Sequence, residues 1–227
     1  MEHLLNNPIW FALQSGNKNI ASGNAQVKFM QRDIGPFAAM EEYSESNFVY
    51  LLEQSKPGDY FILFTHEKIK VPASWTTLVE KTITQMVYLH PSPPSIVADT
   101  NLVVLEEKDV PAMLDLTQRT KPGPFLSGTI ELGNYIGIFE GSKLIAMAGQ
   151  RLKPGVYTEI SAVCTDPAYT GRGLAQKIVT ALVNKILAES RIPMLHLNTD
   201  NNSAYNLYTK IGFQTRREIM VYVIQNK

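Results

Sequence analysis

The chain has 227 residues, of which 44% are apolar, so it is long enough for one large domain or two small ones. Its 21 lysines and arginines balance its 21 aspartates and glutamates. This zero net charge disfavours a nucleic-acid-binding protein, which normally carries a basic face. The single cysteine excludes an intrachain disulfide, and the four histidines show no metal-ligand spacing, so we expect no metal site.

Neither a membrane span nor a signal peptide is expected. No apolar stretch approaches the length that a bilayer requires. Residues 1–5 lack a basic segment followed by an apolar one. We therefore expect a cytoplasmic protein that has no membrane partner.

Residues 1–95 are predicted to form a separate α/β region. Three prolines within residues 90–95 favour an extended connector at its end. A Lys-Pro-Gly triplet precedes an apolar strand at 56–58 and again at 121–123, which fits a decayed duplication and fits chance at least as well. The predicted elements are helices over 47–54 and 75–81 and strands over 60–64 and 86–89.

Residues 96–227 are predicted to form a second domain around one sheet. A helix begins after Asp109, with Pro111 in its first turn, and ends at residues 121–124. The other predicted elements are strands over 102–105, 135–139, 143–148, 156–164, 194–197 and 213–224 and helices over 174–188 and 203–211. This order of strands and helices indicates a mixed α/β or α+β fold.

A glycine-rich loop connects the predicted strand over 156–164 to the helix over 174–188. Its sequence is Thr170-Gly171-Arg172-Gly173-Leu174-Ala175. Glycines let the backbone approach a ligand closely, and the unpaired N–H groups at a helix start favour phosphate. Taken alone, such a loop also serves simply to turn the chain. The Gly-Lys-Ser/Thr of a Walker loop and the third glycine of a dinucleotide fingerprint are both absent from it.

A second cluster, residues 198–213, follows one helix and one strand later. Asp200 or Asn201 is suited to cap the short predicted helix. Ala204, Leu207 and Ile211 share one face of that helix, and Tyr208 lies off the stripe.

Together the two clusters resemble the GNAT superfamily of acyl-CoA-dependent N-acetyltransferases, over residues 102–225. The loop fits the family pattern Gln/Arg-x-x-Gly-x-Gly/Ala at Gly173 and Ala175, with Thr170 where Gln or Arg is usual. Residues 158–163 resemble the fourth strand of the glycine-N-acyltransferase-like branch, in which a degenerate half precedes the catalytic one. The second motif is matched at Asn201, Ala204, Leu207, Tyr208, Gly212 and Phe213.

The resemblance implies a splayed sheet whose fourth and fifth strands part to form a cleft, with acetyl-CoA as the cosubstrate. It also implies that residues 1–95 are a degenerate GNAT-like half. Pantetheine would bond like an added strand to Ala162, Val163, Cys164 and Thr165. The pyrophosphate would lie on residues 170–175, where threonine still offers a backbone N–H. Asn201 would bond the pantetheine arm, cap the helix, or do both, and Ala204 and Tyr208 would border the cofactor.

Two residues are candidates for proton transfer. Glu159 is the candidate base, acting directly or through water, and it is about as readily a solvent-facing strand glutamate. Tyr208 is the candidate acid that protonates the leaving thiolate, with a packing role as the alternative. A cleft-facing His196 would assist the base, although a hydrogen-bonded sheet histidine is the more common case. Cys164 fits a small buried residue better than a nucleophile.

We therefore expect an N-acetyltransferase that moves an acetyl group from acetyl-CoA to a primary amine of a small molecule, an amino acid or a protein. The alternative is a non-catalytic acyl-CoA-binding or sensor module. The sequence does not specify the acceptor. Residues 1–95 are expected either to form one wall of the cleft or to mediate a homodimer.

Overall fold

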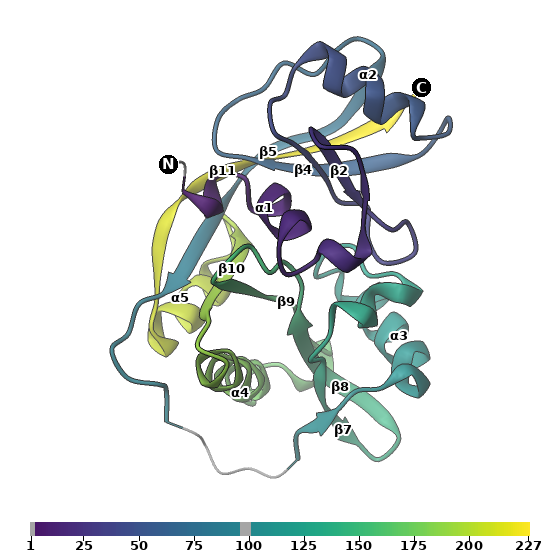
Figure 1. The fold of residues 1–227 in the computed structure, drawn as a ribbon. Coiled ribbons are helices and arrows are strands. Elements are labelled where there is room, and N and C mark those ends of the chain that lie inside the picture. The colour runs from purple at the N-terminus through teal and green to yellow at the C-terminus, as the bar shows by residue number, and fades with distance from the viewer. Residues whose placement is uncertain (1–2, 96–100) are drawn as a thin grey trace.

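A computed structural model describes residues 3–95 and 101–227, and an eight-stranded mixed sheet runs through them (Figure 1). The strands lie in the order β4-β11-β5-β10-β9-β8-β7-β6. They are β4 (Tyr60–Thr65), β5 (Trp75–Tyr88), β6 (Val103–Val104), β7 (Ile136–Glu140), β8 (Lys143–Gln150), β9 (Tyr157–Thr165), β10 (Ile192–Asn198) and β11 (Phe213–Asn226). The predicted mixed α+β fold is confirmed.

A smaller three-stranded sheet lies next to β4, to which one bridge between Phe37 and Ile62 connects it. Its strands are β1 (Ala21–Gly23), β2 (Val27–Met30) and β3 (Ala38–Met40). The helices are α1 (Pro8–Gln14), α2 (Glu45–Glu53), α3 (Val110–Thr120), α4 (Leu174–Ala188) and α5 (Asn202–Ile211). Short 3₁₀ helices are η1 (Leu4–Asn6), η2 (Lys18–Ile20), η3 (Glu107–Asp109), η4 (Ser127–Leu132) and η5 (Pro167–Tyr169). None of the helices in these described residues is long and apolar enough to cross a membrane.

Helices α3 and α4 cover opposite faces of the large sheet. Alternate residues of a strand point to opposite faces. Ala146 and Ala148 of β8 pack in the core that α4 and α5 build, whereas Met147 packs in the core that contains α1 and α3. Helix α4 has the predicted bounds, because its apolar residues recur every fourth position and are fully buried at Ile178, Leu182 and Ile186.

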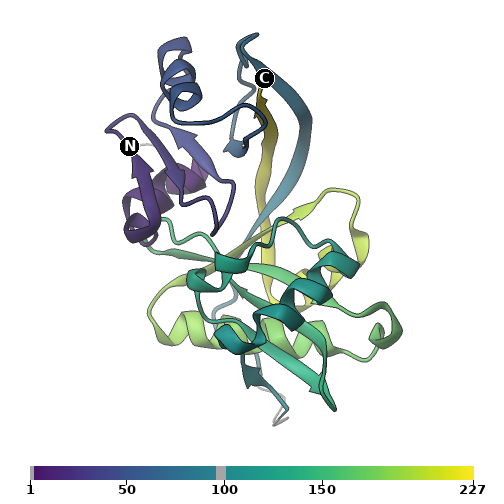
Figure 2. The same ribbon diagram turned by 90° about the vertical axis from the view of Figure 1, so that its right-hand side faces the viewer.

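The main correction to the sequence-based elements concerns residues 75–81, which form a strand and not a helix. Strand β5 runs over Trp75–Tyr88 and pairs with β11 on one side and β10 on the other. Figure 2 shows β5 and β11 running side by side for most of their length. Residues 75–81 pair with β11 along almost their whole length, and this pairing outweighs the weak helical pattern. The β-branched residues Thr76, Thr77 and Val79 also suit an extended backbone.

The first 95 residues therefore contribute two strands, β4 and β5, to the large sheet. The predicted boundary near residue 95 lies between strands of one sheet, since β5 ends at Tyr88 and β6 begins at Val103. Strand β6 has two residues where four were predicted, and β11 is one continuous strand. The predicted strand over 86–89 is the end of β5, and the remaining predicted strands and helices are present within a few residues of the expected bounds.

Candidate active site

The site begins where two parallel strands separate. Strands β9 and β10 pair only through Tyr157–Glu159 and Ile192–Met194. Beyond this point β9 carries a bulge opposite β8, and Ala162 within the bulge has φ +53°. A left-handed backbone costs an alanine about 1–2 kcal/mol, so the surrounding pairing must hold it in place. The bulge turns the backbone of residues 160–165 towards a cleft.

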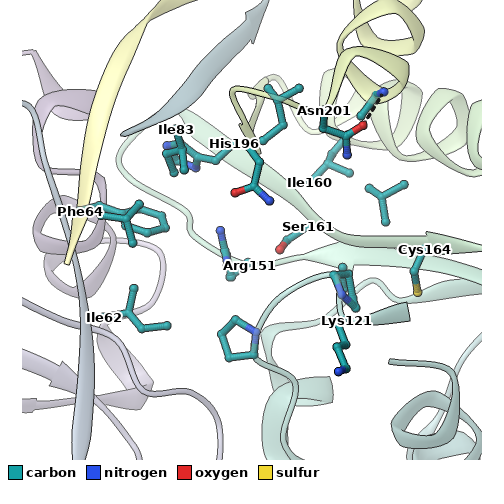
Figure 3. Close-up of a pocket in the computed structure, with 18 of the residues that line it drawn as sticks. Ile62, Phe64, Ile83, Lys121, Arg151, Ile160, Ser161, Cys164, His196 and Asn201 are labelled. Carbon is teal, nitrogen blue, oxygen red and sulfur yellow. Dashed lines mark hydrogen bonds between the residues drawn. The ribbon is translucent and has the colours of Figure 1, made fainter. Parts of the chain in front are cut away.

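The cleft has a volume of about 530 Å³ and receives side chains from both halves of the chain. Strand β9 contributes residues 160–165, and β10 and α5 contribute residues 196–198, Asn201, Ala204 and Tyr208. In Figure 3, Ile62, Phe64 and Ile83 lie on one side, Lys121, Cys164 and Asn201 lie on the other, and Arg151 and Ser161 lie between them. The side from the first half carries Phe37, Ile62, Phe64, Val79, Lys81 and Ile83.

The glycine loop follows directly from the part of β9 that lines the cleft. Gly171 and Gly173 have φ +77° and +73°, so both need the left-handed freedom that glycine supplies. Residues 170–173 are exposed, and α4 begins immediately after Gly173. The Thr170 hydroxyl donates to the Pro167 carbonyl at 3.1 Å, which commits its side chain to the loop. The Arg172 guanidinium lies 4.6 Å from the centre of the Tyr169 ring.

Asp166 anchors the start of this loop, and sequence reasoning assigned it no role. Its carboxylate is 2.8 Å from the Lys143 ammonium, also pairs with Arg119, and accepts the Ala168 N–H at 2.9 Å. The hydrogen bonds from Lys143 and Ala168 are the main reasons that the pKa of Asp166 lies far below its usual range. Its position directly before a proline at a strand end was the available signal.

Glu159 does not line the cleft. It is fully buried, and its carboxylate accepts from Arg151 Nε at 2.8 Å and Arg151 Nη2 at 2.6 Å. Its Oε1 is also 2.6 Å from His196 Nδ1, and its Oε2 accepts the Leu152 N–H at 3.3 Å. Burial alone would raise the pKa of Glu159, but Arg151 and His196 outweigh it and lower the pKa to about 2.

The contacts of His196 continue this polar row across the sheet. The Gln85 Oε1 accepts from Arg216 at 2.8 Å, so the Gln85 amide nitrogen faces the Leu5 carbonyl at 2.9 Å and His196 Nε2 at 3.0 Å. Nε2 is then the acceptor, and Nδ1 carries the hydrogen that Glu159 accepts. Both ring nitrogens of His196 are therefore occupied, although the residue lines the cleft. Gln85 is fully buried and was not identified from the sequence.

Tyr208 and Asn201, both predicted to border the cofactor, line the cleft. Tyr208 is 7% exposed, its ring contacts Phe213 edge-on at 6.0 Å, and burial raises its pKa to about 12. The Asn201 Oδ1 accepts the Ala204 N–H at 3.0 Å, so Asn201 is the N-cap of α5. Cys164 is buried, and burial raises the pKa of its thiol to about 11, which fits a packing residue.

A splayed parallel strand pair, a bulge at the point of separation and a glycine loop that starts the next helix define the GNAT class of fold. The comparisons agree with this. The family described as FR47-like protein matches residues 135–222. The N-alpha-acetyltransferase RimI of Mycobacterium tuberculosis is 34% identical over 85 residues, which are 36% of this chain and 52% of RimI. The chain thus spans about half the length of that curated relative.

A solved structure is similar to the chain over its whole length. It is a putative GNAT-family acetyltransferase of Novosphingobium aromaticivorans, with 31% identity, a TM-score of 0.92 and full coverage of both chains. A Drosophila protein has a TM-score of 0.64 at 16% identity and covers 99% of this chain and 90% of its own, which shows the fold alone. The chain belongs to the GNAT family of acetyltransferases.

Proposed function

We propose that this protein transfers the acetyl group of acetyl-CoA to a primary amine. The observation that carries the proposal is the cleft itself: in a chain of the GNAT family, β9 and β10 part beside a helix that begins directly after an exposed loop with two left-handed glycines. An acyl thioester and an amine have to meet within such a space. Catalysis then rests largely on holding the two in attack geometry.

The cofactor proposal uses one continuous stretch of chain. Pantetheine would bond to the backbone of Ala162, Val163, Cys164 and Thr165 as an added strand. The pyrophosphate would lie on residues 170–175, where the first N–H groups of α4 have no intrahelical partner. Arg172 is an exposed residue of this loop, and its guanidinium would pair with a phosphate bound there. Ala204 and Tyr208 line the same end of the cleft.

The proposed reaction forms one C–N bond and breaks one C–S bond. The neutral amine attacks the thioester carbonyl, the amine nitrogen loses a proton to water, and the departing thiolate gains one. Tyr208 is proposed as the acid for the thiolate and regains its proton from solvent. The products are the amide and coenzyme A. Burial, which raises the pKa of Tyr208 to about 12, keeps the phenol protonated at neutral pH and also makes it a weaker acid than an exposed tyrosine.

The surroundings of Glu159 argue against direct proton transfer from the amine to its carboxylate. Because Arg151 and His196 enclose its carboxylate, any proton from the amine has to reach it through His196 or a water molecule. We therefore propose Glu159 as a positioning residue that fixes the ring of His196 and the guanidinium of Arg151. None of the described residues that line the cleft is an aspartate or a glutamate. Such a cleft favours the neutral amine, and the acceptor would lose its first proton to solvent on entry.

An acceptor screen tests this function. Purified protein would be mixed with acetyl-CoA and a panel of amino acids, polyamines, other amines and peptides, while free thiol is followed optically and the acetylated product is identified by mass. The expected result is thiol release that depends on both an acceptor and Tyr208. Tight binding of acetyl-CoA with no acceptor-dependent release would instead make the protein a non-catalytic acyl-CoA-binding module.

A further inference from the structure

One face of β4, β5 and β11 forms an apolar wall along the cleft. Cross-strand pairing places Ile62 of β4 opposite Val223 of β11, and Val223 opposite Val79 of β5. The neighbouring row is Phe64, Val221 and Lys81. All six side chains line the cleft. We call Ile62, Val79, Val223, Phe64 and Val221 the apolar wall.

The wall follows from strand alternation. Ile62, Phe64 and Val221 are buried and also pack in the core that contains α1 and α3, whereas Val79 and Val223 are half-buried. The intervening residues Phe61, Leu63, Tyr222 and Ile224 point to the other face, where they pack with α2 and Trp75. That second core is complete without the wall. On this face the wall side chains also border the cleft, with Val79 and Val223 the least buried of them, so a molecule that fills the cleft on this side contacts the wall.

The charges around the wall all have the same sign. Lys81 lies at the end of the second row, and Lys121 and Arg151 also line the cleft. The described lining residues include no carboxylate, and the buried Glu159 is already paired with Arg151. The Arg151 guanidinium lies 4.9 Å from the Phe37 ring centre and 5.6 Å from that of Phe64. A second ammonium group on a ligand would meet repulsion here and no partner.

From this arrangement we infer that the acceptor is a monoamine with an apolar body, which lies against the apolar wall while its nitrogen faces Ser161 and His196. The inference rests on the proposed function. The acetyl group has only two carbons, so it leaves a wall that extends over three strands to the acceptor. An apolar body would cover this surface, whereas a polyamine or a lysine-rich peptide would place charge against it.

Two pairs of probes separate the possibilities. Butylamine and 1,4-diaminobutane have the same carbon chain and differ by one terminal ammonium group. Ethylamine and 3-methylbutylamine differ only in the size of the apolar body. Binding of each amine to the CoA-loaded protein would be measured by calorimetry, which does not depend on turnover. Turnover with acetyl-CoA would be measured in parallel.

The matched variants change one methyl group to hydroxyl. Val79→Thr and Val223→Thr keep the shape and the β-branching of the wall, and Val104→Thr is the control, because Val104 is a strand residue that is 67% exposed on β6. We expect 3-methylbutylamine to bind better than ethylamine and butylamine better than 1,4-diaminobutane. The double wall variant should weaken 3-methylbutylamine about tenfold. It should leave the affinity for acetyl-CoA and the behaviour of ethylamine unchanged, as should the control variant.

Three results would overturn the inference. They are tighter binding of the diamine, equal binding of ethylamine and 3-methylbutylamine, and a double variant that changes only the preferred acyl-chain length of the CoA thioester. The last would assign the wall to the donor. Binding in the expected order without turnover would support the subsite and contradict the proposed function, so the two can fail separately.

Discussion

Replacing Glu159 by glutamine removes the charge at the centre of the buried polar row and leaves the shape nearly unchanged. The carboxylate uses both oxygens as acceptors: Oε1 receives Arg151 Nη2 and His196 Nδ1, and Oε2 receives Arg151 Nε and the Leu152 N–H. A glutamine amide has one oxygen. Whichever way it turns, its NH₂ group meets two donors, and Arg151 loses its counter-charge.

The expected loss of stability is large for a single-atom change. Removing one partner of a buried ion pair costs about 3–5 kcal/mol. For a chain of this size each kcal/mol lowers Tm by about 2–4 °C. Thermal unfolding of Glu159→Gln, followed by circular dichroism at pH 7, should therefore occur about 6–20 °C below the wild type. Glu53→Gln, at an exposed position on α2, is the control and should change Tm by less than about 2 °C.

A Tm for Glu159→Gln that matches the control would refute this reasoning, because it would mean that the carboxylate is not the buried partner of Arg151. The same variant, assayed well below its Tm, tests the positioning role. Turnover should fall strongly while the affinity for acetyl-CoA is retained. Wild-type turnover in both this variant and Tyr208→Phe would contradict the whole proton-transfer scheme.

Three further outcomes are expected. Tyr208→Phe keeps the ring and loses the hydroxyl, so kcat should fall about 100-fold or more while the affinity for acetyl-CoA is unchanged. The control is Tyr205→Phe on the exposed side of α5, which should not alter kcat. Equal kcat values for the two variants would contradict the acid role of Tyr208. The Glu159 pKa is about 2 in the folded protein against an ordinary 4.5, so its contribution to stability is complete above about pH 4.5 and is lost as the pH falls towards 2. The free energy of unfolding, measured with urea across this pH range, should fall less in Glu159→Gln than in the wild type. An equal fall in both proteins would contradict the low pKa of Glu159. Asn201→Ala removes the α5 cap and should cost about 1 kcal/mol in the same urea assay, with Asn202→Ala as the neighbouring control.

The parts of the site that the sequence predicted are those with local signals. Gly171 and Gly173 mark left-handed positions, Asn201 caps the helix it precedes, and the buried stripe of α4 recurs every fourth residue. Each depends on residues within a few positions of one another. This is why the loop, α4 and α5 were found close to their true bounds.

The polar row could not be predicted in this way because its members come from different strands and loops, and most of them are far apart in the sequence. Gln85, Arg151, Glu159, His196 and Arg216 come from separate segments, and only strand order brings them together. Burial of Glu159 has the same origin. Both faces of β9 are covered at that point, so consecutive residues are all buried. The alternation of polar and apolar residues along the strand therefore does not predict which side chains are buried.

The position of β5 explains why the first half of the chain matters for chemistry as well as for folding. Because β5 lies between β10 and β11, it supplies hydrogen-bond partners to both strands, and the second half has no continuous sheet without it. The same strand brings Gln85 to His196 and places Val79 and Lys81 on the cleft. Under the proposed function, the recognisable motifs of the second half hold the cofactor, whereas the surface proposed to face the acceptor is built largely by residues with no motif. Acceptor choice can therefore change through β4 and β5 while the cofactor loop stays the same.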